Sequence, residues 1–161
     1  VCVEQDLVAT AWPEVAERVD APLRNAAAVL DGATRGRFVL SHGDFTPSQL
    51  IRLPMGLGLV DLDTLCLAEP AADLGRYLAY HDVVAARRAS GAGDTDARAT
   101  VLAAYGGSRA QRADLDERVR AYRDLNLVLL VLRATRRFKT SRADLALTLL
   151  HTGTTTQGRL P

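Results

Sequence analysis

Residues 38–80 read FVLSHGDFTPSQLIRLPMGLGLVDLDTLCLAEPAADLGRYLAY, and this stretch decides the fold. Two short apolar runs, residues 49–53 and 57–62, are separated by a proline and a glycine, which predicts a β-hairpin. A short strand over residues 37–40 leads into a loop at residues 41–48. The stretch therefore predicts a small antiparallel sheet whose loops carry several polar side chains.

Outside this stretch the apolar residues recur at helical spacing. Pro13 interrupts a first helix over residues 7–19, and Asp20 followed by Pro22 indicates a new helix start. Further helices are expected over residues 22–30 (stopped by Gly32), 70–86 (opened by Glu69-Pro70), 95–105 (after a loop at residues 90–94), 108–138 and 141–153. This order of helices, a small hairpin and further helices predicts a mostly α-helical α+β fold and not an alternating βαβ sheet.

The composition is that of one ordinary globular domain of 161 residues, with 48% hydrophobic and 24% charged residues. Aromatic residues make up only 5%, so the core should consist of Leu, Val and Ala. Residues 127–132 form the longest apolar stretch, whereas a bilayer span needs about 20 residues. We find no signal peptide, so the sequence predicts a cytoplasmic protein without a membrane partner.

The charge is unevenly distributed along the chain. A net charge of +1 gives no overall attraction to nucleic acid, and no nucleic-acid partner is expected. Residues 1–80 carry a net charge of −5, and residues 81–161 carry +6. The basic excess follows predicted helices, where it indicates either a solvated helix face or, as the alternative, a surface facing phosphate or an acidic partner.

Asp44, Gln49 and Asp61 are the candidates for chemistry. Gln49 begins one strand of the predicted hairpin and Asp61 ends the other, so these two should lie close together, with Asp44 on the adjoining loop. Mg²⁺ prefers such oxygen ligands, usually one or two carboxylates plus substrate phosphates. Phosphoryl transfer needs this set, because one carboxylate accepts the proton of the attacking hydroxyl while other oxygens hold the metal.

The order H-G-D-x-x-x-x-[N/Q], hairpin, apolar residue-D and E/D-P-x-x-D-L-G/A resembles the aminoglycoside phosphotransferase and choline kinase superfamily, whose members resemble protein kinases in fold. The resemblance implies that Asp44 is the catalytic aspartate, as base or orienting group for the acceptor hydroxyl. It implies that Asp61 is the principal Mg²⁺ ligand. Gln49 matches a metal-ligating position usually held by asparagine, and glutamine keeps the amide oxygen but adds a methylene.

Further positions belong to the predicted site. The resemblance implies that His42 braces the catalytic loop and that Asp73, from the following helix, holds the backbone of that loop. Asp63, Ser48 and Glu69 are candidate contacts to substrate or to a second metal ion, and Asp63 is equally well interpreted as a surface carboxylate.

The resemblance implies transfer of the γ-phosphate of ATP or GTP, with Mg²⁺, to a hydroxyl of a small molecule such as an aminoglycoside, a sugar or an amino alcohol. Residues 1–161 would then form the C-terminal lobe of a protein-kinase-like fold. The sequence contains no G-x-G-x-x-G loop, and its only lysine, Lys139, comes too late to be the strand lysine that pairs with the phosphates. Because the chain also starts at Val1 without an initiator methionine, we expect a nucleotide-binding lobe upstream and an inactive chain on its own.

Two alternatives stay open. Residues 59–65, LVDLDTL, place two aspartates one residue apart after an apolar strand, as in phosphatases of the haloacid dehalogenase type, although the downstream pattern of that family is missing. The second alternative is a non-catalytic, kinase-like helical interaction module. The presence of Asp44 and Asp61 argues against it, while Gln49 and the missing lobe argue for it.

Overall fold

The computed structural model describes residues 2–32, 37–88, 96–106 and 108–154. Its elements, in chain order, are α1 (Cys2–Ala11), α2 (Pro13–Gly32), β1 (Val39–Ser41), a 3-10 turn (Pro47–Gln49), β2 (Leu50–Leu53), β3 (Gly56–Leu59), a second 3-10 turn (Leu62–Thr64), β4 (Cys66–Ala68), α3 (Pro70–Arg87), α4 (Ala97–Tyr105), α5 (Arg109–Arg136) and α6 (Thr140–Thr154). The predicted mostly helical α+β fold with small antiparallel strand pairs is confirmed. The loop expected at residues 90–94 lies outside the described residues.

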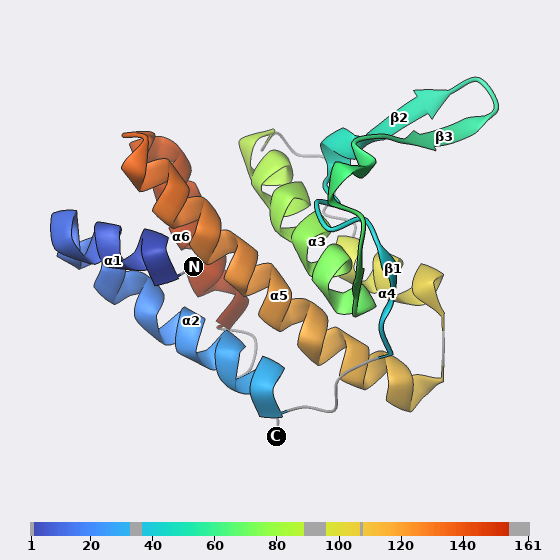
Figure 1. Ribbon diagram of the computed structural model, residues 1–161, viewed down its shortest axis with the longest axis horizontal. Helices are drawn as coiled ribbons and strands as arrows, with labels where there is room; N and C mark the ends of the chain where they lie inside the picture. Colours follow the sequence, from blue (N-terminus) through green and yellow to red (C-terminus); the bar gives the residue numbers. More distant parts are fainter. Residues whose placement is uncertain (1, 33–36, 89–95, 107, 155–161) are drawn as a thin grey trace.

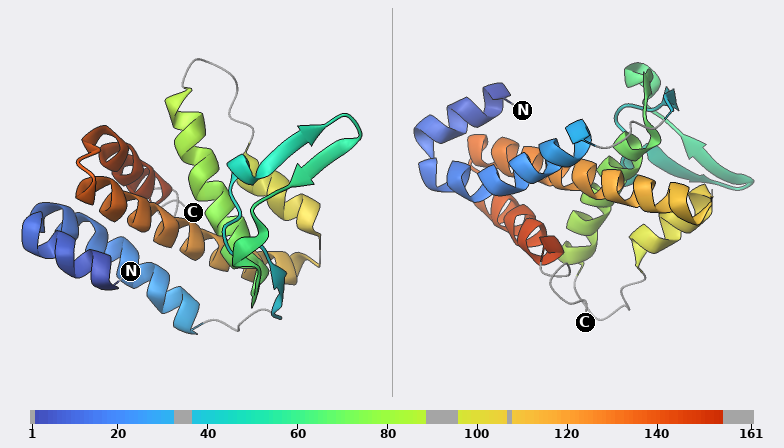
Figure 2. Two further views of the ribbon diagram at one scale, coloured as in Figure 1. Left: turned by 45° about the horizontal axis from the view of Figure 1, so that its top comes forward. Right: turned by 90° about the horizontal axis from the view of Figure 1, so that it is seen from below.

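Helix α5 is the central element of the helical body (Figure 1). It packs against α1 and α2 on one side, against α3 and α4 on the other, and against α6. The β2–β3 hairpin projects away from these helices in all three ribbon views (Figures 1 and 2). Among the described residues, no helix combines the length and apolar character needed to cross a membrane.

The core consists of aliphatic side chains, as the composition predicts. Leu127, Val131 and Leu132 of α5 are fully buried. They pack with side chains of α1, α2, α3 and α6, including Val8, Val19, Ala79, Val83, Ala146, Leu147 and Leu150. Truncating one such leucine to alanine typically costs about 2–5 kcal/mol, so α5 is the element on which the fold depends most.

The start of α5 follows from a capping box. The Ser108 hydroxyl accepts a hydrogen bond from the Gln111 backbone N–H, and the Gln111 side chain accepts one from the Ser108 N–H. The predicted helix start at Ser108 is therefore confirmed. Helix α4 likewise begins where Asp96 caps the N–H of Ala99.

The predicted helix start at Asp20–Pro22 is wrong, because α2 runs through Pro22 without a break. A proline inside a helix removes one backbone hydrogen bond, here the one that the Arg18 carbonyl would accept. Arg18 lies on the exposed side of α2, where water can replace the missing donor. Val19 and Ala26, two turns apart, are both buried and keep one face of the helix on the core.

The strands form two separate antiparallel pairs. The predicted hairpin is confirmed, with Leu50 opposite Leu59 and Leu53 opposite Gly56. Strand β3 ends at Leu59, however, so Asp61 follows the strand and does not end it. Strand β4, which the sequence did not predict, pairs with β1 and brings the start of the 41–48 loop beside the start of α3.

Downstream of β4, the described residues form helices and turns only. The alternating strands that a phosphatase of the haloacid dehalogenase type would need after residues 59–65 are therefore not found in the part of the chain that the structure describes. The start of the last helix differs by one residue from the prediction, since α6 begins at Thr140 and Ser141 lies inside it.

Candidate functional site

The loop that follows β1 is held by the first turns of α3. The Asp73 carboxylate accepts hydrogen bonds from two consecutive backbone N–H groups, at 2.6 Å from the His42 nitrogen and 3.0 Å from the Gly43 nitrogen. A carboxylate that accepts two N–H bonds is a strong anchor, because hydrogen bonds to an ionised acceptor are stronger than neutral ones. Asp73 therefore fixes the backbone one residue ahead of Asp44.

The buried His42 ties its own loop to the residues on either side of Asp61. Its Nε2 lies 2.9 Å from the Val60 carbonyl oxygen, and its Nδ1 lies 3.3 Å from the Asp44 backbone nitrogen. Because the carbonyl can only accept and the N–H can only donate, the ring proton belongs on Nε2. The Thr64 hydroxyl also donates to the His42 carbonyl at 2.8 Å. The 41–48 loop is thus tied to both sides of Asp61.

Gly43 is required by this packing. Its φ of 80° lies in the region that glycine tolerates, and a Cβ there would lie 2.2 Å from the Thr64 carbonyl oxygen. A side chain at this position would push the 41–48 loop away from Thr64, so the packing requires glycine between His42 and Asp44.

Gln49 and Asp61 lie together, as the hairpin argument predicts. The Gln49 Nε2 donates to the Asp61 Oδ2 at 3.0 Å, and the Val60 N–H donates to the Gln49 carbonyl at 3.1 Å. Asp61 is exposed and adopts a left-handed backbone conformation, with φ 63° and ψ 59°, that aspartate tolerates better than most residues. The pair forms the root of the projecting hairpin.

Asp44 makes an ion pair with Arg76 of α3, one turn beyond Asp73. Arg76 was not predicted from the sequence, although its spacing from Asp73 on a helix puts both on one side. The Arg76 guanidinium also lies over the ring of Tyr80, 5.7 Å from its centroid. Among the described residues, no ion pair or hydrogen bond joins the Asp44 side chain directly to Gln49 or Asp61. Asp44 is connected to the neighbourhood of Asp61 through the His42 ring, which contacts the Asp44 N–H and the Val60 carbonyl.

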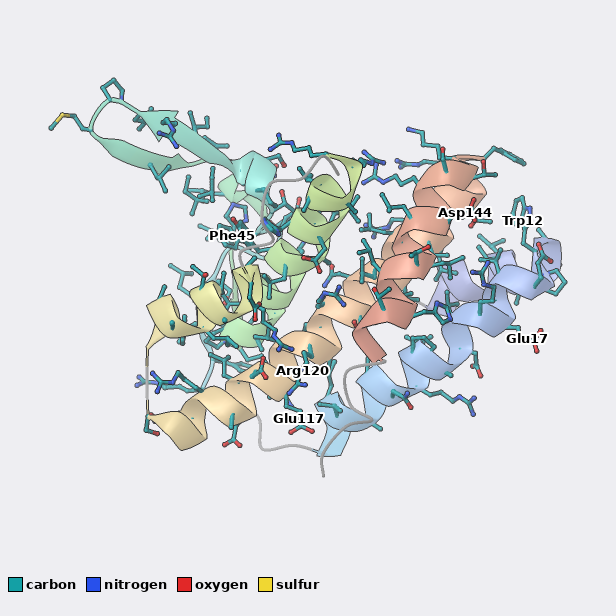
Figure 3. All side chains as sticks on the ribbon, turned by 180° about the vertical axis from the view of Figure 1, so that it is seen from behind. Trp12, Glu17, Phe45, Glu117, Arg120 and Asp144 are labelled. Carbon is teal, nitrogen blue, oxygen red and sulfur yellow. The ribbon has the colours of Figure 1, made fainter. Side chains whose placement is uncertain are left out.

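An aromatic row covers the same face of α3. The Phe45 ring stacks on Tyr77 at a centroid distance of 5.3 Å, and Tyr77 stacks on His81 at 6.1 Å. Figure 3 shows Phe45 beside α3, at the opposite end of the body from Trp12. These rings were not predicted as part of the site, although Tyr77 and His81 have the i, i+4 spacing that brings side chains together on a helix.

The predicted contact of Glu69 to substrate or metal is wrong. Glu69 is buried, and its carboxylate accepts two hydrogen bonds from Arg118 of α5 and one from the Tyr122 hydroxyl at 2.6 Å. Burial, together with the hydrogen bond to Glu69, raises the pKa of Tyr122 to about 12. A carboxylate that is surrounded in this way fastens β4 to α5 and presents no open face to a ligand.

Two other predicted contacts remain accessible. Asp63 is exposed in the 3-10 turn after Asp61. Ser48 is exposed, and its hydroxyl lies 2.8 Å from that of the buried Thr46. Asp82, another carboxylate of α3, is engaged by Arg123 at 2.6 Å.

The donor set fits a magnesium ion that also binds phosphate. In the described ranges, no group of three or more His, Cys, Asp or Glu side chains could hold a metal ion by itself. Mg²⁺ usually needs only one or two carboxylates, because water and substrate phosphates complete its shell. The exposed Asp61 carboxylate matches that requirement, and the Gln49 amide, whose N–H faces Asp61, would bring its oxygen to the same ion by turning over.

The chain matches one family model, that of a phosphotransferase enzyme family, over residues 3–122. The match runs from α1 into the first half of α5 and includes every residue of the candidate site. No curated protein and no solved structure matched the chain.

Proposed function

Because the chain belongs to the phosphotransferase enzyme family, we propose that it moves the γ-phosphate of ATP or GTP to a hydroxyl group of a small molecule, with Mg²⁺ bound at the root of the hairpin. The observation that carries this proposal is the bracing of the Asp44 loop by Asp73 and His42 beside the Gln49–Asp61 pair.

In the proposed reaction, Asp44 orients the acceptor hydroxyl and takes its proton as the oxygen attacks the γ-phosphorus. The new O–P bond forms as the bond from the γ-phosphorus to the bridging oxygen breaks, and a nucleoside diphosphate leaves. Mg²⁺ would supply neutralisation of phosphate charge, with Asp61 and Gln49 as its protein ligands. Arg76, which pairs with Asp44, has to share that carboxylate with the incoming hydroxyl.

The proposal includes the C-terminal lobe of a protein-kinase-like fold, with a nucleotide-holding lobe as a further part of the protein. Support comes from the hairpin, whose apolar side chains face solvent: Met55 is 98% exposed and Leu57 70%. Ile51, Leu53 and Leu59 are exposed as well. The register places Leu57 and Leu59 on one face of the hairpin and Ile51 and Leu53 on the other. Apolar side chains exposed in this number commonly mark a segment that another part of the protein covers.

The charges around the site bear on the acceptor. A polycationic aminoglycoside would need several uncommitted carboxylates, but Asp73 holds the loop, Asp82 pairs with Arg123 and Glu69 is buried. Of the carboxylates of Asp63, Glu69, Asp73 and Asp82, that of Asp63 alone is exposed. This distribution favours a sugar or an amino alcohol over a polycationic acceptor.

The test measures acceptor-dependent, Mg²⁺-dependent release of nucleoside diphosphate by the complete protein with a panel of hydroxylated acceptors. Asp44→Asn should lower kcat by about 10²- to 10⁴-fold, the usual contribution of a general base, with little change in thermal stability. Asp114→Asn, at an exposed position of α5, is the matched control and should keep full activity. Near-normal turnover by Asp44→Asn would overturn the assigned role and favour the non-catalytic interaction module.

A further inference from the structure

A basic pocket of about 180 Å³ lies among α3, α5 and α6, and nothing in the proposed reaction uses it. Its lining consists of Tyr80, Leu130 and Ala134 together with the cationic residues Arg133, Arg137, Lys139 and Arg142. Within the part of the chain that the structure describes, no acidic residue lines it. Most of the lining lies beyond residue 122, where the family match ends, so the pocket is not explained by the matched part of the chain.

A defined turn shapes this pocket at the end of α5. The Phe138 N–H donates to the Thr135 carbonyl and the Lys139 N–H to the Ala134 carbonyl, both at 2.9 Å. Together with a φ of 53° at Phe138, these bonds form a Schellman motif. The Phe138 ring meets Trp12 edge-on, with centroids 5.6 Å apart. The turn between α5 and α6 thus has a fixed conformation, and it places Arg137 and Lys139 at the pocket.

The helix dipole accounts for only part of this charge. Basic residues at the C-terminal end of α5, such as Arg133 and Arg137, complement the negative end of that helix. Lys139 and Arg142 are different, because they lie at the N-terminal end of the 15-residue helix α6, where the helix already carries partial positive charge. The Lys139 carbonyl accepts hydrogen bonds from the N–H groups of Arg142 and Ala143, which fixes Lys139 as the residue that precedes the helix.

Three of the four pocket cations have no carboxylate partner among the described residues. Arg137, Lys139 and Arg142 make no ion pair with any carboxylate in the ranges that the structure describes. Cations gathered around one concave space repel one another, and the repulsion is stronger where the protein wall excludes water. An anion in the pocket would remove that repulsion.

We propose that this pocket binds a phosphate group, free or carried by a small metabolite, through Arg137, Lys139 and Arg142. A volume of about 180 Å³ leaves space for one phosphate and a small organic portion. Three cationic side chains, two from the turn after α5 and one from α6, give the multiple charge-assisted hydrogen bonds that phosphate requires. The proposal does not depend on the phosphotransferase reaction.

The pocket nevertheless adjoins the candidate site through one side chain. Tyr80 lines the pocket, and its ring contacts Arg76, which pairs with Asp44. A test therefore has to report on the pocket itself and not on phosphate bound at the root of the hairpin.

Lys139 offers such a readout, because it is the only lysine of the chain. We would acylate the complete protein with an amine-reactive ester in the absence of Mg²⁺ and nucleotide, and follow Lys139 by mass spectrometry. Glucose 6-phosphate or inorganic phosphate should slow its acylation at least fivefold, whereas glucose, or sodium chloride at matched ionic strength, should not. If inorganic phosphate protects Lys139 better, the pocket binds free phosphate. If glucose 6-phosphate protects it better, the pocket binds a phosphate group carried by a small metabolite. Equal acylation rates with and without both phosphates would overturn the proposal.

Charge removal gives the second arm. The double substitution Arg137→Gln and Arg142→Gln should raise the phosphate concentration for half-protection at least tenfold, because each substitution removes a charge-assisted hydrogen bond. Arg112→Gln is the control for the single substitution Arg142→Gln, since each removes one positive charge, and Arg112 lies in α5 about 30 Å along the helix from Arg133. Asp61→Asn should leave protection unchanged, which separates the pocket from the proposed metal site. Equal weakening by Arg112→Gln would show a general charge effect and overturn the proposal.

Discussion

The Asp73 carboxylate and the His42 backbone nitrogen, 31 residues apart in sequence, lie 2.6 Å apart, and the adjacent Gly43 N–H donates to the same carboxylate. One side chain of α3 thereby sets the direction in which the chain leaves β1. The position of Asp44 therefore depends on α3 as well as on its own loop.

Replacing Asp73 by asparagine should loosen this loop. An amide offers one acceptor oxygen and turns an N–H donor toward the second backbone N–H, so one of the two hydrogen bonds is lost. We expect the free energy of unfolding to fall by about 1–3 kcal/mol, measured by urea denaturation. Asp114→Asn, on the exposed surface of α5, should change it by less than about 0.5 kcal/mol. Equal stability of both variants would mean that the anchor contributes nothing.

Gly75 should not tolerate a side chain. A Cβ at this buried position would lie 2.5 Å from the Tyr122 Cβ and 2.7 Å from the Val119 carbonyl oxygen, so α3 and α5 touch there backbone to backbone. Gly75→Ala should cost about 1–3 kcal/mol by forcing the two helices apart. Gly32→Ala is the control, because nothing lies within 4 Å of a Cβ at the end of α2. Wild-type thermal stability of both variants would contradict the close contact between α3 and α5 at Gly75.

Alkaline pH should destabilise the fold through Tyr122. Its pKa is about 12 in the folded chain, above the ordinary value of 10.0, so the folded state favours the protonated hydroxyl. The resulting stabilisation is fully present below pH 10 and is lost as the pH rises to about 12, because the unfolded chain releases this proton first. Urea denaturation at several pH values should show this fall in the free energy of unfolding.

The Tyr122→Phe variant isolates this contribution. It should flatten the alkaline part of the stability profile, whereas Tyr105→Phe, at an exposed position, should leave that profile as in the wild type. An unchanged slope in Tyr122→Phe would assign the alkaline loss to other groups.

The hairpin should be dispensable for the stability of this chain. Met55→Gln together with Leu57→Gln replaces side chains that are already exposed, so the free energy of unfolding of the isolated chain should change by less than about 0.5 kcal/mol. The complete protein should lose more than the isolated chain if another segment covers these residues. A clear loss in the isolated chain would show that the hairpin packs against the helices.

Local signals in the sequence were sufficient where the structure is local. The capping box at Ser108, the proline and glycine between the two hairpin strands, and the Glu69-Pro70 helix start each act within a few residues, and each predicted its element. The adjacency of Gln49 and Asp61 followed from the hairpin alone.

Features that depend on long-range contacts were not predicted. Strand β4 has only three residues and exists because β1 pairs with it across 25 residues or more. Glu69 looked available because its partners, Arg118 and Tyr122, lie about 50 residues away on α5. Arg76 gave only the weak signal of its spacing from Asp73. In each case a tertiary contact decided the environment of the residue.

The His42–Val60 hydrogen bond has a consequence for local opening. A two-stranded hairpin on its own is marginally stable, so the tip around Met55 should breathe and exchange its amide hydrogens readily. The Val60 carbonyl accepts a hydrogen bond from the His42 imidazole, and this bond lies between the fraying tip and Asp61. Strand separation that starts at the tip should therefore stop at Val60, one residue before Asp61, the proposed magnesium ligand.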